Sequence, residues 1–239
     1  MGVVEDKGLD IIRCDRVKLT KKGRDLLQDV SFAVSQGEFV GIAGPSGAGK
    51  TSLLRILNLL HSPTAGTVTY KSKDVMSCDP TQLRREIGYV LQKPYLFEGT
   101  VRDNLEYPYL VWKQNPDYEE INTYLTKVNL SSSVLDKRGS EMSGGEQQRI
   151  ALVRSLLAKP EVLLLDEVSS ALDEDNTLIL EQLIREERES RNLTVIFISH
   201  NTGQLRRLAQ KVLYLENGQL NFFGPAEGFF QMRGDAKNE

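Results

Sequence analysis

A glycine-rich run in the first quarter of the chain has the residue types needed to hold the phosphates of a nucleotide. It fits the pattern G-x-x-x-x-G-K-[ST] and comprises Gly44, Pro45, Ser46, Gly47, Ala48, Gly49, Lys50 and Thr51, with Ser52 directly behind. Glycines let backbone N–H groups approach phosphate oxygens that a side chain would keep away. In this pattern Lys50 reaches the β- and γ-phosphates, and Thr51 presents its hydroxyl to Mg²⁺. The run therefore predicts a phosphate-binding loop.

Two adjacent carboxylates, Asp166 and Glu167, directly follow the apolar run Val162–Leu165. In a parallel sheet, the strand end that carries them lies at the same edge as the phosphate-binding loop. There Asp166 would hold Mg²⁺, directly or through water, and Glu167 would polarise an attacking water as general base. Many strands simply end in solvated acids, but the upstream phosphate loop favours the catalytic interpretation.

A second glycine-containing run, Met142–Arg149, reads Met-Ser-Gly-Gly-Glu-Gln-Gln-Arg. Ser143 and Glu146 have the spacing of a capping box, which stabilises a helix start without any further function. The free N–H groups of such a start can also bind an anion. The pair Gly144–Gly145 weakens a helix start and is not explained by a cap. Both interpretations can hold together, so the chain has two separate places for phosphate.

The run 142–149 resembles the signature motif of ABC (ATP-binding cassette) proteins. The order of the motifs is similar to theirs from about residue 10 to residue 225. This resemblance implies an α/β fold, namely a P-loop NTPase cassette with a mainly parallel sheet core, an antiparallel β subdomain and a helical subdomain. It also implies a Mg²⁺-dependent ATPase, with ATP and Mg²⁺ bound at the site.

Three single residues match positions of the same family. The resemblance places Gln92 in the glutamine loop, where it would touch Mg²⁺ or the attacking water. It places His200 at the switch histidine, which bonds the γ-phosphate and organises Glu167; with Lys50 these residues form the expected catalytic set. Asp173 matches the loop that links two sites across a dimer, although a helix N-cap explains an aspartate there equally well.

The resemblance further implies two protein partners. Two copies of the chain would pair head-to-tail, with ATP held between the phosphate loop of one copy and Ser143–Gly145 of the other, across a symmetric interface. A transmembrane permease subunit would dock near Tyr95–Phe97, where an apolar groove after Gln92 would take a helix. The alternative for this stretch is a partly buried loop whose aromatic residues only pack.

Within the family, the chain resembles the ATP-binding subunits of Fet-type bacterial iron-efflux systems and STAR-type plant aluminium-tolerance transporters. The resemblance includes Asn104–Pro108 and Gln114–Asp117. It favours export, of iron or another metal ion. Phosphate-import cassettes look broadly similar, so import remains an alternative. A third alternative is a regulatory module that dimerises with ATP but turns over little, although such a module needs no base at Glu167.

The elements that must position these residues alternate between strand and helix. Strands are predicted at Ile11–Leu19, Leu27–Val34, Glu38–Ala43, Thr67–Tyr70, Ile87–Leu91, Val162–Leu165 and Thr194–Ile198. Helices are predicted after the phosphate loop as far as Leu60, over Gly145–Ala158 and over Leu178–Arg191. Val212–Leu215 and Gln219–Phe223 are expected to form a hairpin, because Asn217-Gly218 suits a type I′ turn.

We expect residues 1–239 to form a single domain. The ATPase core with its β subdomain would take up about 10–93 and 143–225, and a helical subdomain that leads into the signature would take up about 94–142. Residues 226–239 are expected to be a polar tail, loose from Gly234 onward.

The composition excludes several other classes of protein. Lys and Arg total 30 against 33 Asp and Glu, for a net charge of −3, so a nucleic-acid partner is not expected. No apolar run approaches the roughly 18 residues that cross a bilayer, so the chain is not expected to be a channel itself.

Two cysteines, Cys14 and Cys78, exclude a cysteine-based zinc site and are expected to be inert thiols. The first twelve residues include three acids and do not resemble a secretory signal. We expect a cytoplasmic protein, peripheral on the inner face of the cell membrane through its permease.

One position departs from the family pattern. Family members usually stack the adenine on an aromatic residue ahead of the phosphate loop, and that place falls near Leu19 or Thr20. Neither residue is aromatic. Stacking of a base on an aromatic side chain is worth about 1–3 kcal/mol in nucleic-acid complexes. The sequence therefore predicts a weaker grip on adenine and looser selectivity between bases.

Overall fold

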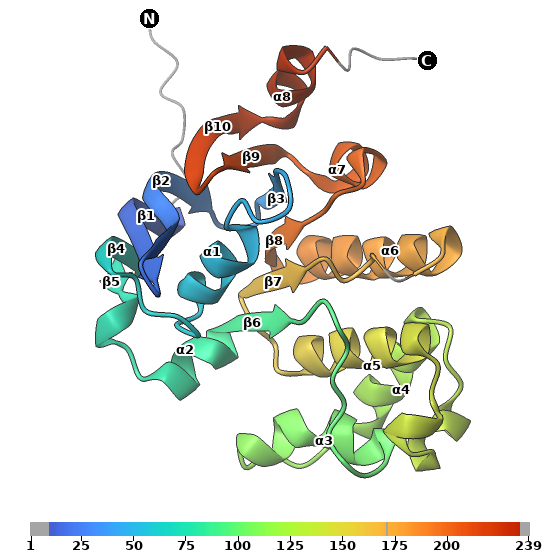
Figure 1. Cartoon of the computed structure of the whole chain (residues 1–239). Helices are drawn as coiled ribbons and strands as arrows, with labels where there is room; N and C mark the ends of the chain where they lie inside the picture. The colour runs from blue at the N-terminus through green and yellow to red at the C-terminus, as the bar shows by residue number, and fades with distance from the viewer. Residues whose placement is uncertain (1–9, 171, 235–239) are drawn as a thin grey trace, which may run out of the picture.

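The computed structural model describes residues 10–170 and 172–234, which form two sheets and a set of helices (Figure 1). Within these residues the larger sheet has six strands in the order β10-β9-β3-β8-β7-β6. Their bounds are Phe39–Ala43 for β3, Ile87–Val90 for β6, Val162–Asp166 for β7, Thr194–Ile198 for β8, Lys211–Glu216 for β9 and Gln219–Pro225 for β10. Only β10 runs antiparallel to its neighbour, which confirms the mainly parallel core.

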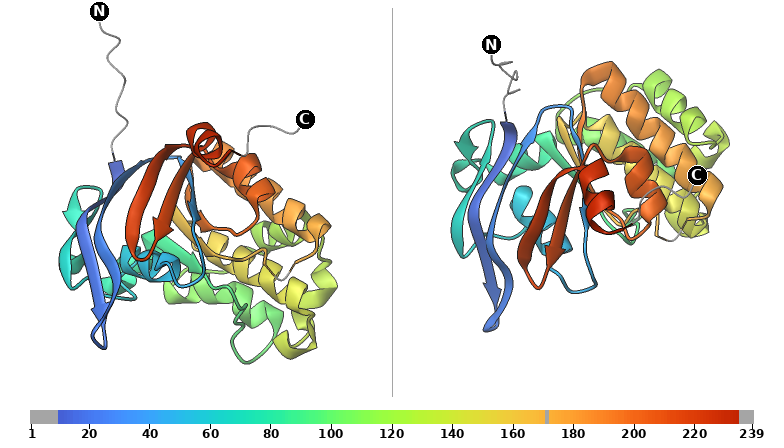
Figure 2. Two further views of the ribbon diagram at one scale, coloured as in Figure 1. Left: turned by 45° about the horizontal axis from the view of Figure 1, so that its top comes forward. Right: turned by 90° about the horizontal axis from the view of Figure 1, so that it is seen from above.

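The smaller sheet is antiparallel, in the order β2-β1-β4-β5. It is formed by β1 (Asp10–Lys21), β2 (Arg24–Ser35), β4 (Ala65–Tyr70) and β5 (Lys73–Asp74). Strands β1 and β2 make a long hairpin that extends along one side of the molecule (Figure 2). This sheet is the antiparallel β subdomain that the resemblance implied.

Helix α1 (Lys50–Leu57) packs in a core shared by the two sheets. Its side chains Leu53, Leu54, Ile56 and Leu57 are all fully buried. Burial of each such side chain contributes roughly 1.5–3 kcal/mol. The helix that follows the phosphate-binding loop is therefore fixed from both sides.

The remaining helices lie largely on the other face of the larger sheet. They include α3 (Val101–Val111), α4 (Tyr118–Lys127), α5 (Gly144–Leu157), α6 (Glu174–Arg191) and α7 (Thr202–Leu208), while the short α2 (Pro80–Glu86) precedes β6. Along β7, Leu163 and Leu165 face this second core, whereas Val162 and Leu164 face the core around α1. Both faces of the strand are covered, which explains its uninterrupted apolar sequence. Helices α3 and α4 fall within residues 94–142, the stretch expected to be helical, and lie beside α5 at one end of the molecule (Figure 1).

The C-terminal stretch differs from the polar tail that the sequence suggested. Residues 226–232 form helix α8 (Ala226–Met232), in which Phe229 and Phe230 are only 1% and 5% exposed. The ring of Phe229 packs against Tyr214 and Phe222 of the β9–β10 hairpin. Aromatic burial thus outweighs the polar composition of this stretch, and residues 235–239 lie outside the described part of the chain.

The end of α1 and the turn between β9 and β10 were both predicted from the sequence. Helix α1 ends at Leu57 rather than near Leu60, because Leu59 adopts a positive φ of 57° and breaks the helix; Leu60 is 44% exposed. The predicted hairpin is confirmed. Asn217 and Gly218 have φ values of 50° and 78°, the left-handed pair that a type I′ turn requires.

None of the described helices combines the length and apolarity needed to cross a bilayer. Cys14 is buried, and burial raises the pKa of its thiol far above the usual range, which keeps it protonated and unreactive. Cys78 is only partly buried.

Candidate nucleotide site

The phosphate-binding loop connects the end of β3 to the start of α1, as the sequence predicted. Gly44 has a φ of +143°, and a Cβ atom there would lie 2.0 Å from the carbonyl oxygen of Leu215 on β9. Gly49 has a φ of +101°, and a Cβ atom there would lie 2.5 Å from the carbonyl oxygen of Leu26 on β2. Only glycine fits these two positions, because any side chain would collide with a carbonyl of β9 or β2. The loop therefore packs closely against strands that are distant in the sequence.

The turn between β9 and β10 also supports this loop. The N–H of Gly218 donates to the carbonyl of Ala48 at 3.2 Å, and the carbonyl of Gly218 accepts from the N–H of Gln28 at 2.8 Å. One turn near the C-terminal end thereby joins the phosphate loop to the small sheet.

Lys50 lies inside the curve of the loop and is 5% exposed. Its ammonium donates to the carbonyls of Gly44 at 2.8 Å and Pro45 at 2.9 Å. Burial lowers the pKa of Lys50, and the negative charges of Glu167 and Asp166 act in the opposite direction. A buried ammonium held by backbone carbonyls is well placed to bind phosphate oxygens.

Asp166 ends β7 at a position that is only 2% exposed. Its Oδ1 accepts from the hydroxyl of Thr51 at 2.9 Å, and its Oδ2 accepts from the hydroxyl of Tyr89 at 2.7 Å. Hydroxyl and carboxylate oxygens are ligands that Mg²⁺ prefers. Sequence reasoning paired Thr51 with Asp166 but missed Tyr89, whose signal was a hydroxyl within an otherwise apolar strand.

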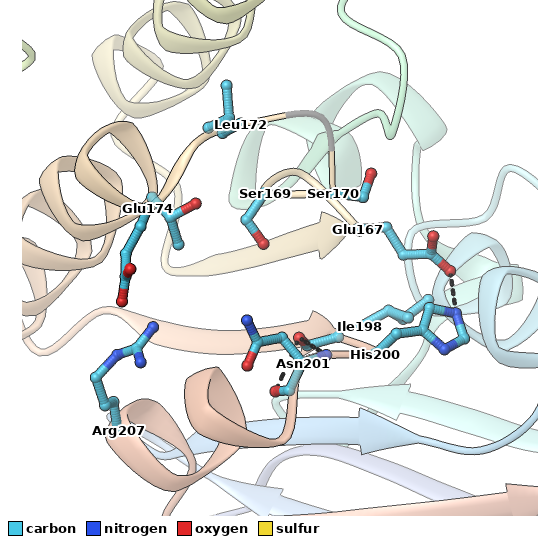
Figure 3. Close-up of a pocket in the computed structure, with 11 residues that line it drawn as sticks. Glu167, Ser169, Ser170, Leu172, Glu174, Ile198, His200, Asn201 and Arg207 are labelled. Atoms are coloured by element: carbon cyan, nitrogen blue, oxygen red, sulfur yellow. Dashed lines mark hydrogen bonds and ion pairs between the residues drawn. The ribbon is translucent and has the colours of Figure 1, made fainter.

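Glu167 follows at once and has a φ of +51°, a left-handed conformation that is uncommon away from glycine. Its Oε2 accepts from the side-chain amide of Gln92 at 2.6 Å, and its Oε1 lies 2.9 Å from Nε2 of His200 (Figure 3). The three residues follow β6, β7 and β8, which are adjacent parallel strands. Their carboxyl ends meet at one edge of the sheet, so the structure brings together the three residues that the sequence singled out.

A cavity of about 370 Å³ joins the phosphate loop to these side chains. It is lined by Leu26, Ser46, Gly47, Ala48, Gly49, Lys50, Thr51, Ser52, Gln92, Glu167 and His200. A second cavity of about 590 Å³ opens on the other side of Glu167 and His200, and Ser169, Ser170, Leu172 and Glu174 also line it (Figure 3). Glu167 and His200 therefore line both of these cavities.

Ser143 caps helix α5 with the full capping box. Its Oγ accepts from the N–H of Glu146 at 3.3 Å, and the carboxylate of Glu146 accepts from the N–H of Ser143 at 2.8 Å. This bond to Ser143 lowers the pKa of Glu146. None of Ser143, Gly144 and Gly145 lines the cavity at the phosphate loop. Within one chain the structure does not bring the two predicted phosphate places together.

Asp173 caps helix α6, whose start lies four residues before the predicted one. Its carboxylate accepts from the N–H of Asn176 at 2.8 Å, which confirms the capping alternative. That bond lowers the pKa of Asp173. A role across a dimer stays a prediction.

The family pattern expects an aromatic residue at Leu19 or Thr20. One of these residues is aliphatic and the other is polar. Leu19 is buried at 2% exposure, whereas Thr20 is exposed and its hydroxyl donates to Asp25 at 2.6 Å. Leu26, which sequence reasoning did not single out, is a large aliphatic side chain that lines the cavity at the phosphate loop. The structure therefore offers an aliphatic contact in place of a stacking ring.

We expect weak discrimination between ATP and GTP. GTP should displace labelled ATP at concentrations within about tenfold of unlabelled ATP, because no Phe, Tyr or Trp of the described residues lines the cavity. Thr20→Tyr should tighten ATP binding by about 5- to 150-fold, the equivalent of stacking worth about 1–3 kcal/mol. Thr20→Val, which loses the hydroxyl and gains no ring, is the control. Strong ATP preference in the unmodified protein would contradict this expectation.

Comparison with known proteins places these features in a family. The ABC transporter family model matches residues 27–170. Protein STAR1 of rice (Oryza sativa) is 40% identical over 200 residues, which span 83% of this chain and only 58% of STAR1. The probable iron export ATP-binding protein FetA of Escherichia coli is 39% identical over 80% of this chain and 84% of its own.

A phosphate import ATP-binding protein of Natronomonas pharaonis, PstB 2, is 38% identical over 90% of this chain and 80% of its own. Among solved structures, the dimeric post-hydrolysis state of the ATP-binding cassette MJ0796 bound to ADP and phosphate is similar, with a TM-score of 0.81 and 27% identity. That match covers 90% of this chain and 98% of the other. Family, relatives and fold agree with the phosphate loop, the paired acids and the sheet topology, and the chain belongs to the ABC transporter family as an ATP-binding and ATP-hydrolysing cassette.

Proposed function

We propose that this cassette powers a membrane transporter by closing a dimer of two copies around ATP and reopening it after hydrolysis. The arrangement at Glu167 carries the proposal. One carboxylate oxygen is bonded by Gln92 and the other by His200, at the edge of the cavity that the phosphate loop lines. A carboxylate held in this way is oriented to accept a proton from a water molecule next to the phosphates.

The loop residues Gly44 to Ser52 would hold the phosphates of ATP through backbone N–H groups and the dipole of α1. Lys50 would stabilise the charge that develops on the transferred phosphoryl group. Thr51, Asp166 and Gln92 offer a hydroxyl, a carboxylate and an amide oxygen, a donor set that fits Mg²⁺. No group of three or more acidic, histidine or cysteine residues in the described chain could hold a metal alone, which agrees with Mg²⁺ being held partly by phosphates.

In the reaction that we propose, Glu167 takes a proton from the attacking water. Gln92 and His200 keep its two oxygens in place, so the carboxylate does not turn away toward solvent. Mg²⁺, when bound, would neutralise negative charge on the phosphate oxygens. His200 would in addition bond the γ-phosphate, since it lines the same cavity as the loop.

The second phosphate place supports a site shared by two copies. Ser143, Gly144 and Gly145 begin α5 with exposed or half-buried positions, and they are absent from the lining of the cavity in their own chain. A second copy in head-to-tail orientation would bring them to the phosphates and complete two equal sites. Asp173, in the loop after Glu167, would then connect one site with the other.

A groove of about 660 Å³ supports the proposal that a membrane-spanning partner docks on this chain. Residues 94–99, 138–140 and Gln147 line it, and Tyr95 is 60% exposed there. Arg154 of α5 donates to the carbonyl of Tyr95 at 2.7 Å and lies 4.5 Å from the ring centre of Phe97. Gln147 of the same helix donates to the carbonyl of Met142 at 2.9 Å. A partner helix in the groove would therefore contact residues that are hydrogen-bonded to α5, the helix that Ser143 caps.

We place the chain on the cytoplasmic face of the cell membrane, held by this permease partner. For the solute we propose export of iron or another metal ion, bound by the partner, which the similarity to FetA supports. Import is the second candidate, because a phosphate import protein matches a larger share of the chain at nearly the same identity.

Deletion of the gene in its own cells distinguishes the two directions. After iron loading, we expect cells that lack the gene to retain at least about twice as much iron as wild-type cells, because an exporter without its ATPase does not turn over. Cellular iron measured by mass spectrometry, beside uptake of labelled phosphate, checks this. The wild-type gene should restore the lower iron content and the Glu167→Gln gene should not. Normal iron with reduced phosphate uptake would support import instead.

A further inference from the structure

Tyr89 lies on the strand next to the one that carries the two acids. It belongs to β6, which pairs in parallel with β7 in a register that sets Tyr89 beside Leu164. Its hydroxyl reaches two residues further along β7 and donates to Oδ2 of Asp166 at 2.7 Å. The ring packs against the apolar core around α1, the helix that begins with Lys50 and Thr51.

This contact gives Asp166 a second donor. Thr51 bonds Oδ1 and Tyr89 bonds Oδ2, so each carboxylate oxygen has a partner from a different element. Asp166 is only 2% exposed, so these two side chains replace most of the water that a carboxylate would otherwise bind. A tyrosine hydroxyl ordinarily keeps its proton at physiological pH, so it can serve as a donor to this carboxylate.

We propose that Tyr89 is a positioning residue of the Mg²⁺ site: its hydroxyl fixes Asp166 by Oδ2 and keeps Oδ1 directed to Thr51, where the metal would be held. The proposal rests on the metal role proposed above for Asp166. Polar groups that orient metal ligands in this way typically change metal affinity by about 10- to 100-fold when they are removed.

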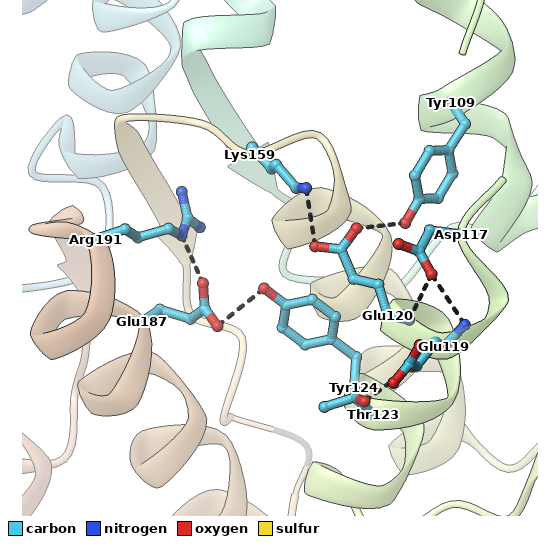
Figure 4. A network of polar contacts seen from close by, with 9 residues as sticks. All are labelled: Tyr109, Asp117, Glu119, Glu120, Thr123, Tyr124, Lys159, Glu187 and Arg191. Atoms are coloured by element: carbon cyan, nitrogen blue, oxygen red, sulfur yellow. Dashed lines mark hydrogen bonds and ion pairs between the residues drawn. The ribbon is translucent and has the colours of Figure 1, made fainter. Parts of the chain in front are cut away.

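The chain contains a matched phenol–carboxylate bond far from the phosphate loop. The hydroxyl of Tyr124 on α4 donates to the carboxylate of Glu187 on α6 at 2.9 Å (Figure 4). Tyr124 and Glu187 are 8% and 5% exposed, so this bond is also buried. Neither residue lines the cavity at the phosphate loop. Tyr124→Phe therefore removes the same chemical group without touching the site.

The experiment measures Mn²⁺, as a paramagnetic probe for Mg²⁺, bound to the full-length protein with a non-hydrolysable ATP analogue. Tyr89→Phe, which keeps the ring, should weaken Mn²⁺ affinity in electron paramagnetic resonance titrations by about 10- to 100-fold. Binding of the analogue in EDTA should stay within about twofold of the wild type. Tyr124→Phe should change neither value, and Asp166→Asn should weaken Mn²⁺ binding at least as much as Tyr89→Phe.

Unchanged Mn²⁺ affinity in Tyr89→Phe, with Asp166→Asn impaired, overturns the role of Tyr89 alone. Normal Mn²⁺ binding in Asp166→Asn overturns the metal role of Asp166 and this inference with it. Equal losses in Tyr89→Phe and Tyr124→Phe, or an equal loss of binding in EDTA, also overturn the inference, because they indicate a general effect on the fold.

Discussion

Glu167→Gln is expected to lower the rate of ATP hydrolysis by about 10²- to 10⁴-fold while ATP still binds. Glutamine has nearly the same shape as glutamate but cannot accept a proton from water. The phosphate loop, Lys50 and Thr51 are unchanged in this variant, so the affinity for ATP should stay within a few-fold. Steady-state phosphate release and equilibrium binding of labelled ATP measure the two quantities separately.

An ATP-bound dimer should accumulate in this variant, because closure proceeds and hydrolysis does not. Size-exclusion chromatography with and without ATP checks this outcome. Glu174→Gln is the matched control, since Glu174 also lines a cavity beside the site but contacts neither Gln92 nor His200 in the described hydrogen bonds. Hydrolysis at the wild-type rate in Glu167→Gln would remove the base from the proposed mechanism and favour a regulatory module.

Lys50→Ala is expected to reduce ATP affinity by about 100-fold or more. The ammonium is a buried charge inside the phosphate loop, and charge-assisted hydrogen bonds are worth about 1.5–3 kcal/mol each. Lys50 is expected to bond both the β- and the γ-phosphate. The loss of both bonds corresponds to a decrease in ATP affinity of at least about two orders of magnitude. Isothermal titration calorimetry with ATP and Mg²⁺ measures the affinity.

Lys211→Ala serves as its control, because Lys211 pairs with Glu38 away from the loop. Lys50→Ala also tests the shared site when mixed with Ser143→Arg. Each variant alone should be inactive, whereas the mixture should form dimers with one intact site, built from Lys50 of one copy and Ser143 of the other. Full activity of Ser143→Arg alone, or wild-type affinity in Lys50→Ala, would contradict this account.

Much of the site could be predicted because parallel strands impose their own geometry. The acids follow an apolar strand, and the family resemblance singled out Gln92 and His200 after two others; these residues meet because β6, β7 and β8 are neighbours. The phosphate loop was recognisable from its glycines and lysine. The capping box at Ser143 followed from two residue types at one spacing.

Other features depended on information that a linear pattern does not contain. The bond from Tyr89 to Asp166 requires the register between β6 and β7, which no local motif fixes. Helix α8 was missed because the ring of Phe229 packs against Tyr214 and Phe222 of the β9–β10 hairpin, a tertiary contact that the local sequence does not indicate. The early end of α1 depends on the left-handed backbone of Leu59, which carries no sequence signal of its own.

The contacts of the β9–β10 hairpin with the phosphate loop bear on the order of events during synthesis. The nucleotide-binding motif leaves the ribosome early, yet Ala48 accepts a hydrogen bond from Gly218 and Gly44 packs closely against the carbonyl of Leu215, both from near the other end of the chain. Chains emerge from the N-terminus at about 5–20 residues per second. The nascent chain therefore carries its ATP motif for many seconds before these contacts can form. Because a ligand stabilises only the state that binds it, any stabilisation by ATP that needs these contacts begins only after the hairpin has been synthesised.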